Sequence, residues 1–483
     1  MTKENNGERK SLILWAMLPF VVLVALMFIV IRIFGADAMN GGSQVALILS
    51  SGVAIVISML VFRVKWQELE NAICENFRNV CSAILILLLI GAIGGSWMTS
   101  GIVPTLIVYG LKVIHPAIYL FAACLICALV SVMTGSSWTT VATLGVALVA
   151  IGRALGYSPA ICAGAIISGA YFGDKISPLS DTTVLASSMS GVPLFEHIRY
   201  MMRTTGPAFV IALVIYLVIS LCHKSPSLAE AEEMEHILRA TFRISPWLLI
   251  VPAITGVMIW KKVPAILTLL AASLLAALTA LIAQPQLVAQ IAGCEGSLDA
   301  GSAFNGIVTM LACSTSLETG SAATDALVQT SGMGGMLLTI FLISCASTFG
   351  GAMVGGGMIG VLTDALTRHI STRHGLVCAT IATGIFANLT TGDQYLSIIL
   401  TSRIYKNVYT KLKKEGRLLS RSVEDSATIT SVLIPWNSCG MTQSTVLRIS
   451  TISYLPFCFF NLISPFISIA DAFIQERKEG KAS

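Results

Sequence analysis

Residues 172–187, FGDKISPLSDTTVLAS, combine two carboxylates, one amine and several hydroxyl side chains in a short stretch. Pro178 removes a backbone donor and interrupts a helix, which frees an upstream carbonyl oxygen. Carboxylate, hydroxyl and free carbonyl oxygens at a broken helix bind hard cations such as Na⁺. We therefore predict a cation site in which Asp174 and Asp181 supply the charge.

The same two aspartates also suit proton binding. Asp174 and Asp181 are seven residues apart, so they share one face of an intact helix or line one cavity if Pro178 breaks that helix. Two carboxylates held close together repel each other when both are ionised, so one of them retains a proton near neutral pH. Exchange of that proton for a cation is the minimal chemistry of an antiporter. Neutral oxygens beside the aspartates come from Ser177, Thr182 and Thr183.

Lys175 follows Asp174 directly and has two interpretations. Its amine pairs with Asp174 or Asp181 and is released when a cation arrives, or it holds the anionic group of a substrate. A plain surface loop over 173–181 is the structural alternative, and the apolar runs on both sides argue against it.

A second polar set lies more than 200 residues further on. It contains Asp393 within TTGDQYLS and the side chains Asn437, Ser438, Thr442 and Gln443 within IPWNSCGMTQST. These residues are candidates for the same ion and proton site. The alternatives are a helix N-cap for Asp393 and helix–helix hydrogen bonds for Asn437 and Gln443. Glu424 and Asp425 follow a basic loop, and we interpret them as the start of a helix.

The composition predicts the elements that position these residues. Of the 483 residues, 55% are hydrophobic and 11% are charged, and the mean hydropathy is +0.82. Soluble domains carry about 25% charged residues, so we predict an all-α polytopic membrane protein. Apolar runs too long for barrel strands exclude a β-barrel. We expect about 11–14 transmembrane segments, several of them discontinuous or re-entrant, and 117–151 and 375–404 form either hairpins or crossings. A net charge of +5 does not indicate nucleic-acid binding.

Similar features recur in the same order in the two halves. Thr134-Gly135 aligns with Thr391-Gly392, Thr183-Val184-Leu185 aligns with Thr445-Val446-Leu447, and Pro435 mirrors the break at Pro178. We predict an internal duplication. The expected parts are a cytoplasmic tail at 1–11, a first repeat at 12–222, a polar linker at 223–245, a second repeat at 246–475 and a cytoplasmic tail at 476–483.

Lysine and arginine positions predict the orientation, because cytoplasmic loops carry the excess of these residues. Arg63 and Lys65, the loop from Arg403 to Arg421 and the C-terminal tail are basic, whereas residues 263–367 contain no Lys or Arg. Both termini and the 403–421 loop are expected inside, and 284–330 outside. The first apolar runs of the two halves, 12–34 and 246–260, then cross in opposite directions, which predicts an inverted repeat.

The segments GAYFGDKISPLSDTT and EDSATITSVLIPWNSCGMTQSTVL resemble the NhaC family of bacterial Na⁺/H⁺ antiporters, which includes malate/lactate-coupled Na⁺ antiporters. The resemblance extends from about residue 45 to 465. It implies Na⁺/H⁺ exchange across the cytoplasmic membrane of a bacterium by alternating access, in an inverted-repeat fold. It places the motif acids at Asp174 and Asp181, beside Ser177 and Thr182, and the second motif at Asn437, Ser438, Thr442 and Gln443.

Other classes of function fit less well. A Na⁺-coupled carboxylate or amino-acid transporter stays open, with Lys175, Asn437 and Ser438 as partners of a substrate carboxylate. An intramembrane aspartyl protease is disfavoured, because no Tyr-Asp pair occurs. We expect a transporter and not an enzyme, with Na⁺ and H⁺ as transported ions and no cofactor. The expected surroundings are the lipid bilayer, with no nucleic acid, and a homo-oligomer stays open.

Overall fold

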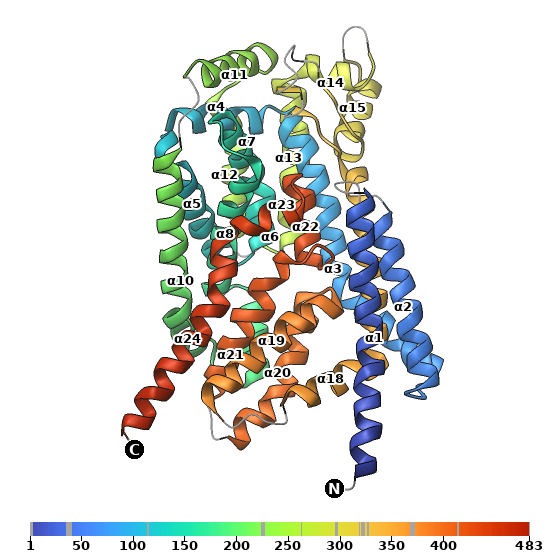
Figure 1. Cartoon of the computed structure of the whole chain (residues 1–483). Helices are drawn as coiled ribbons and strands as arrows, with labels where there is room; N and C mark the ends of the chain where they lie inside the picture. Colours follow the sequence, from blue (N-terminus) through green and yellow to red (C-terminus); the bar gives the residue numbers. More distant parts are fainter. Residues whose placement is uncertain are drawn as a thin grey trace.

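The computed structural model is a bundle of α-helices, many of them interrupted (Figure 1). It describes residues 3–34, 41–113, 115–223, 228–261, 263–294, 298–317, 319, 324–325, 328–367, 372–412 and 415–482. The first part contains α1 (Lys3–Phe34), α2 (Gly42–Leu60), α3 (Trp66–Thr99), α4 (Ile102–Val113), η2 (Pro116–Ile118), α5 (Tyr119–Thr134), α6 (Ser137–Thr140), η3 (Val141–Gly145), α7 (Val146–Ala154), α8 (Pro159–Ile176), α9 (Asp181–Ser190), α10 (Leu194–Cys222) and α11 (Leu228–Thr241).

The second part has a similar succession of short and long helices. It contains η4 (Pro246–Leu249), α12 (Ile250–Trp260), α13 (Ala265–Ala283), α14 (Pro285–Ile291), α15 (Ala300–Ala312), η5 (Met333–Met336), α17 (Leu337–Gly355), α18 (Met358–Thr367), α19 (Arg373–Thr391), α20 (Gln394–Lys411), α21 (Gly416–Val423), η6 (Glu424–Thr428), η7 (Ser431–Leu433), α22 (Ser438–Leu447), α23 (Thr451–Tyr454), η8 (Leu455–Phe457) and α24 (Phe459–Ala482).

Several helices have the length and apolar composition of membrane spans. In the described part of the chain, eight helices pass by these criteria, and two bent helix pairs raise the number to ten. The sequence predicts 11–14 segments. The smaller number has a physical reason: α8 and α19 are 18 and 19 residues long but carry the polar breaks, and neither is among the eight.

The two ends of the bundle differ in the segments that they carry. Both termini lie at one end, together with the basic connection between α20 and α21 (Figure 1). The helices α11, α14 and α15 lie at the opposite end. This arrangement agrees with the predicted sidedness, in which the termini share one side with the basic loop and the 284–330 segment lies on the other.

A constant spacing of 257 residues relates the second half to the first. Gly135 and Gly392 both follow a helix end in the left-handed conformation, with φ of +66° each. The helices α9 and α22 have ten residues each, and their N-caps, Ser180 and Asn437, are also 257 positions apart. The same spacing relates α8 to α21, η6 and η7, relates η2–α5 to α19, and relates α10 to α23, η8 and α24.

This spacing corrects one alignment made from the sequence. Thr183-Val184-Leu185 and Thr445-Val446-Leu447 are 262 positions apart, which is five residues out of register with the helices that contain them. The chance recurrence of three common residues produced the match. Pro178 and Pro435 do keep the spacing, so the second proline break lies where the sequence predicts it.

Equivalent helices run in opposite directions. The η5 turn that leads into α17 meets the later part of α3, because Gly332 lies against Gly91, and the end of α17 meets the beginning of α3 at Leu69. In α10 and α24, the backbone N–H of Phe459 donates to the Tyr216 hydroxyl at one end, and Arg203 pairs with Asp471 at 3.9 Å at the other. The predicted inverted repeat is thus confirmed for these helices.

Small residues let the helices of the core approach closely. A Cβ atom at Gly169 would lie 2.0 Å from the Cys124 carbonyl oxygen, and one at Gly173 would lie 2.2 Å from the Ala128 carbonyl oxygen. Only glycine fits at these two contacts between α5 and α8. The end of α8, which carries Asp174 and Lys175, is therefore held against α5.

Candidate functional site

Three helix breaks meet around one cavity of about 830 Å³. They are the breaks between α5 and α6, between α8 and α9, and between α19 and α20. The start of α13 and two residues of α3 complete the wall. The polar residues that line the cavity are Ser82, Thr134, Ser136, Thr139, Asp174, Ser180, Asp181, Thr182, Thr268, Asp393, Gln394 and Tyr395.

The α5–α6 and α19–α20 breaks have the same construction. A left-handed glycine ends the first helix, and an N-cap side chain begins the next. Ser136 accepts from the N–H of Thr139 at 3.2 Å, and Asp393 accepts from the N–H of Leu396 at 2.9 Å. Each break thus brings the carbonyl end of one helix and the amide end of another to the cavity, which gives it both acceptors and donors.

The α8–α9 break covers residues 177–180, on both sides of Pro178, as the sequence predicts. The Ser177 hydroxyl donates to the Val132 carbonyl oxygen at 2.7 Å, and the Thr183 hydroxyl donates to the Lys175 carbonyl oxygen at 2.9 Å. These two predicted site residues hold the break in shape and do not line the cavity. Thr182 does line it, and its hydroxyl contacts that of Ser180 at 3.0 Å.

Asp174 and Asp181 line the same cavity, so the broken-helix alternative is the one that the structure adopts. Asp174 is almost buried, and its Oδ2 accepts from the backbone N–H and the hydroxyl of Ser137, at 3.0 and 2.7 Å. Both donors belong to the first turn of α6, where the helix dipole also favours a negative charge. Asp181 begins α9 and is exposed in the cavity.

Asp393 serves as the N-cap of α20, which confirms the capping alternative, and it also lines the cavity. Its second carboxyl oxygen accepts from the Ser438 hydroxyl at 3.2 Å. Ser438 itself lies behind the cavity wall, because its N–H donates to the Gly392 carbonyl oxygen at 2.8 Å. One carboxylate therefore joins α20 and α22 beside the cavity.

The remaining predicted residues of the second half lie behind this wall. Asn437 caps α22 and donates to Asn388 at 3.3 Å, which is the predicted helix–helix hydrogen bond. The Thr442 hydroxyl donates to the Ser438 carbonyl oxygen at 2.7 Å. Gln443 is fully buried, and among the described residues its side-chain oxygen and nitrogen find no partner. None of the three lines the cavity.

The contacts of the site repeat with the 257-residue spacing. Asp174 and Ser137 correspond to Ser431 and Gln394, and these are also bonded, from the Ser431 hydroxyl to the Gln394 side-chain oxygen at 3.0 Å. The spacing likewise relates Asp393 to Ser136. The first repeat therefore has its aspartate at one position of this pattern, Asp174, and the second repeat has its aspartate at another, Asp393. The backbone arrangement is repeated, but the positions of the charges are not.

Lys175 does not pair with Asp174 or Asp181, which corrects the prediction made from its position. Its side chain is fully buried and forms an ion pair with Asp425, next to the Ser464 hydroxyl at 3.4 Å. Since Lys175 is the residue after Asp174 on a helix, its side chain leaves α8 in another direction and points away from the cavity.

Asp425 and Glu424 are not at a helix start, which corrects a second prediction. Both lie fully buried in η6, a π-helical turn that continues α21. Asp425 also accepts from the Thr204 hydroxyl at 2.9 Å and lies 3.8 Å from Arg421. The basic residues just before them suggested a surface loop followed by a helix start. Burial against α8, α10 and α24 shows instead that they lie inside a continuing helix.

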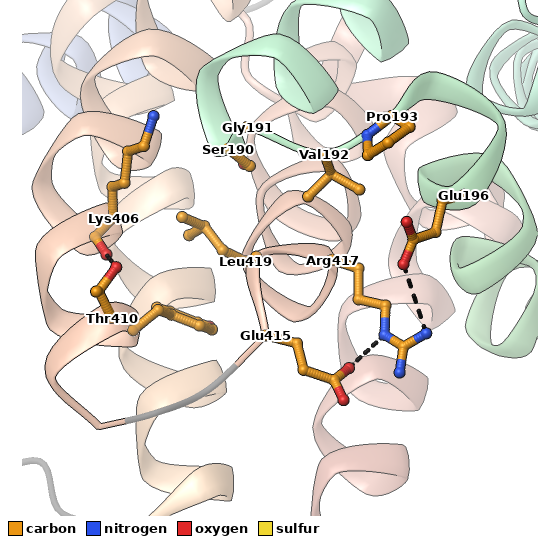
Figure 2. A pocket seen from close by; sticks show the side chains of 12 residues that line it. Ser190, Gly191, Val192, Pro193, Glu196, Lys406, Thr410, Glu415, Arg417 and Leu419 are labelled. Atoms are coloured by element: carbon orange, nitrogen blue, oxygen red, sulfur yellow. Dashed lines mark hydrogen bonds and ion pairs between the residues drawn. The ribbon is translucent and has the colours of Figure 1, made fainter.

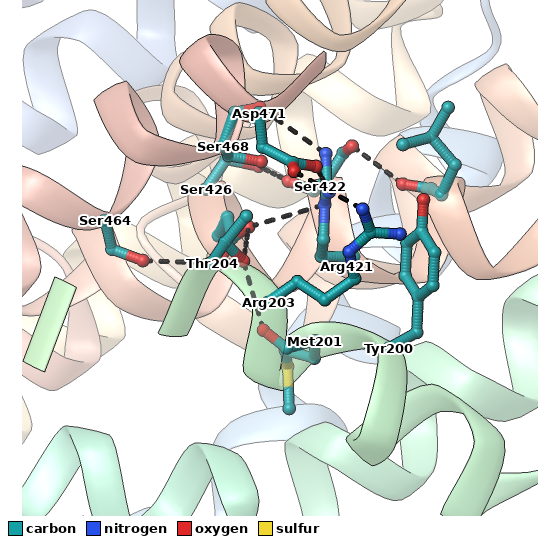
Figure 3. A network of polar contacts seen from close by, with 12 residues as sticks. Tyr200, Met201, Arg203, Thr204, Arg421, Ser422, Ser426, Ser464, Ser468 and Asp471 are labelled. Carbon is teal, nitrogen blue, oxygen red and sulfur yellow. Dashed lines mark hydrogen bonds and ion pairs between the residues drawn. The ribbon is translucent and has the colours of Figure 1, made fainter. Parts of the chain in front are cut away.

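The network continues from Asp425 through Arg421 to Asp471 of α24, and Figure 3 shows Arg421 beside Asp471. The buried Arg421 pairs with Asp471 of α24, and its guanidinium carbon lies 5.4 Å from the centroid of the Tyr200 ring. Asp471 also accepts from the Gln475 amide at 2.6 Å. This network was not predicted from the sequence. Arg421, Glu424 and Asp425 lie within about one helical turn beside an apolar segment, and this spacing could have indicated a buried charge cluster.

A second cavity, of about 510 Å³, lies between the α9–α10 turn and the α20–α21 connection (Figure 2). Arg417 pairs with Glu415 and lies 3.6 Å from Glu196 at its rim. These side chains are largely exposed, and none of the predicted ion-site residues lines this cavity. The cavity at the three breaks is therefore the candidate transport site.

Inverted helical repeats, with carboxylates and hydroxyls at helix breaks around a cavity, are the architecture of a secondary transporter. The oxygen donors of this cavity also fit Na⁺. The chain belongs to the Na⁺/H⁺ antiporter family, whose model matches residues 5–188 and 169–473. This finding confirms the resemblance seen in the sequence motifs.

Individual relatives cover most of the chain. It is 39% identical to the Na⁺/H⁺ antiporter NhaC of Alkalihalophilus pseudofirmus, over 84% of this chain and 85% of that protein. It is 35% identical to the malate-2H⁺/Na⁺-lactate antiporter of Bacillus subtilis, over 87% of each chain. It is also 35% identical to the Na⁺/H⁺ antiporter NhaC of Bacillus subtilis, over 88% of this chain and 91% of that protein.

Proposed function

We propose that this protein exchanges Na⁺ for H⁺ across the cytoplasmic membrane of a bacterium, with Asp174 and Asp181 as the residues that bind either ion. The observation that supports this most directly is the convergence of three helix breaks on one cavity that contains Asp174, Asp181 and Asp393. Family membership supports the identity of the two ions.

Competition for the same oxygens couples the two ions. Asp174 is held by two donors from Ser137, which stabilise its ionised form, while Asp181 is open to the cavity. A cation between them receives both charges and the hydroxyl of Thr182. Protonation of either carboxylate removes charge from the site, so Na⁺ leaves when protons bind and protons leave when Na⁺ binds.

The inverted repeat supplies the change of access. Equivalent helices of the two repeats run in opposite directions across the membrane. If each repeat adopts the conformation that the other has in this structure, the cavity opens to the opposite side of the membrane. The α8–α9 and α19–α20 breaks are the flexible points of this change. Asp393 contributes a third charge and, through Ser438, connects the site to α22.

A second candidate is exchange coupled to a small carboxylate, which the similarity to the malate-2H⁺/Na⁺-lactate antiporter favours. The cavity volume of about 830 Å³ is also larger than a single ion needs. Lys175 does not serve as the partner of such an anion in this structure, since its amine is bound to Asp425. The anion would instead contact a bound Na⁺ and the hydroxyl groups of the wall.

Purified protein in liposomes tests both candidates. An inward Na⁺ gradient is imposed, and the internal pH is followed with a dye, with and without malate or lactate on either side. Alkalinisation of the lumen driven by Na⁺ alone supports simple exchange. A response that requires the carboxylate supports the coupled candidate, and no response under either condition contradicts the proposal.

A further inference from the structure

The buried cluster around Lys175 and Asp425 has no charged equivalent in the other repeat. The residues 257 positions away are uncharged: Gly164 corresponds to Arg421, Ile167 to Glu424, Ser168 to Asp425 and Val432 to Lys175. The same helices therefore form in one repeat without these charges. Buried charges that a fold does not need are expensive to keep at membrane depth, which indicates a role in function.

The buried charges of the cluster are balanced without Glu424. Lys175 and Arg421 supply two positive charges, and Asp425 and Asp471 supply two negative charges, each within an ion pair of the network. Arg203 also lies 3.9 Å from Asp471, but its side chain is half exposed, so water solvates its charge at the edge of the cluster. An ionised Glu424 would add an unmatched negative charge. All of its cationic neighbours are already bound to other carboxylates.

Glu424 is also without hydrogen bonds. It is fully buried, and among the described residues neither of its carboxyl oxygens has a partner. The Thr428 hydroxyl, one helical turn further on, lies near this carboxyl group but forms no well-aligned hydrogen bond with it. An ionised carboxylate in such a place is strongly disfavoured, whereas the protonated form is tolerated. Glu424 therefore carries a proton in this conformation.

We propose that Glu424 is a second proton-binding residue of the exchange, separate from the acids that line the cavity. This inference rests on the proposed Na⁺/H⁺ exchange. Glu424 binds one proton on a carboxyl oxygen and releases it as H⁺, and no bond other than O–H changes.

Electrostatic interactions connect this proton to the cation site. The charge of Asp174 opposes ionisation of Glu424, and the charge of Lys175 favours it. When Na⁺ neutralises Asp174, the opposing charge is removed and Glu424 releases its proton. Lys175 follows Asp174 at the end of α8, so a change at the α8–α9 break also moves the amine relative to Asp425 and Glu424.

The charged groups that act on Glu424 are Lys175 and Asp174 of α8 and its neighbour Asp425. The elements packed against η6 also carry titratable side chains, namely Asp181 of α9, Tyr405 of α20, Arg421 of α21 and Asp471 of α24, and His197 of α10 interacts with Lys175 and Asp425. The part of α19 that packs against η6 is at Gly384, which lies against Ser426. This part of α19 carries no charged side chain.

The number of protons exchanged per Na⁺ tests the proposal. Proteoliposomes are held at zero membrane potential, and the pH gradient that stops net flux is found for a fixed Na⁺ gradient. If n protons are exchanged per Na⁺, net flux stops when the inside-to-outside concentration ratio of Na⁺ equals the inside-to-outside concentration ratio of protons raised to the power n. We expect n of two or more in the wild type and a value lower by one in Glu424→Gln. A wild-type n of one, or the same n in both proteins, would overturn the proposal.

Control variants separate this result from a general loss of activity. Glu196→Gln, at an exposed ion pair on α10, should leave n unchanged. Glu424→Asp keeps the titrating group and should restore the wild-type n. If the wild type itself shows no Na⁺-driven proton flux, the proposed function fails, whereas a working exchanger with an unaltered n rejects only the role of Glu424.

A spectroscopic measurement on the wild type covers the case in which Glu424→Gln does not fold. Because the cavity acids are aspartates, isotope labelling of glutamate alone distinguishes Glu424 from them in infrared spectra. The carbonyl band of a protonated glutamic acid should decrease when Na⁺ is added at constant pH. No Na⁺-dependent change in this labelled band would contradict the proposal.

Discussion

At the scale of single residues, the proposed exchange depends on how Asp174 is held. A carboxylate near the middle of a membrane protein is stable only when it is hydrated, paired or hydrogen-bonded. Asp174 has two donors from Ser137 and an open side toward the cavity. In the proposed exchange, these bonds stabilise the ionised carboxylate that accepts Na⁺, and the open side lets protons compete for it.

Removing one of these donors should shift the competition toward protons. In Ser137→Ala the backbone N–H remains, but the hydroxyl bond of 2.7 Å is lost. Hydrogen bonds to charged groups contribute about 1.5 kcal/mol or more, so the apparent KM for Na⁺ should rise by roughly tenfold, with a larger effect at lower pH. Ser302→Ala is the matched control, because the Ser302 hydroxyl also donates to an aspartate, Asp299, which is the exposed N-cap of α15. An unchanged KM in Ser137→Ala would show that the hydroxyl does not tune the site.

At the scale of helices, the left-handed glycines shape the breaks. Gly135 has φ of +66°, and a Cβ atom there would lie 2.6 Å from Leu179 in the neighbouring break. Gly135→Ala adds about 1–2 kcal/mol of backbone strain to this overlap, so both the Tm and the transport rate should fall. Gly256→Ala, in the interior of α12 with open space around it, should leave both unchanged or raise the Tm slightly. Thermal unfolding in detergent measures the difference, and equal Tm values would refute the importance of this contact.

The breaks and their chemistry were predictable because proline, glycine and capping residues act locally. Pro178 follows the end of α8 and Asp393 begins α20, as expected. The partners of Lys175 and Asp425 were not predictable, because these residues are 250 positions apart and meet only through packing. Likewise, Ser177, Thr183 and Thr442 carry the expected residue types, but the direction of each side chain depends on the local backbone.

At the scale of the whole molecule, the charge distribution predicts which end of the bundle faces the cytoplasm. The C-terminal end of α24 carries Arg477 and Lys478, and residues 263–367 lack Lys and Arg. Alkaline phosphatase, which is active only outside the cytoplasm, should be inactive when fused after α24 and active when fused after α14. A cytoplasmic fluorescent reporter at the same two sites serves as the reciprocal control. The opposite pattern of activity would invert the orientation.

The central claim is that Asp174 exchanges Na⁺ for protons, and everted membrane vesicles test it most directly. Vesicles come from a host without its own antiporters, respiration acidifies their lumen, and a dye reports the pH gradient when NaCl is added. We expect Na⁺ to dissipate the gradient with the wild type and with Asp299→Asn, because Asp299 caps α15 and does not line the cavity, but not with Asp174→Asn. A normal response from Asp174→Asn, at equal expression, would contradict the account.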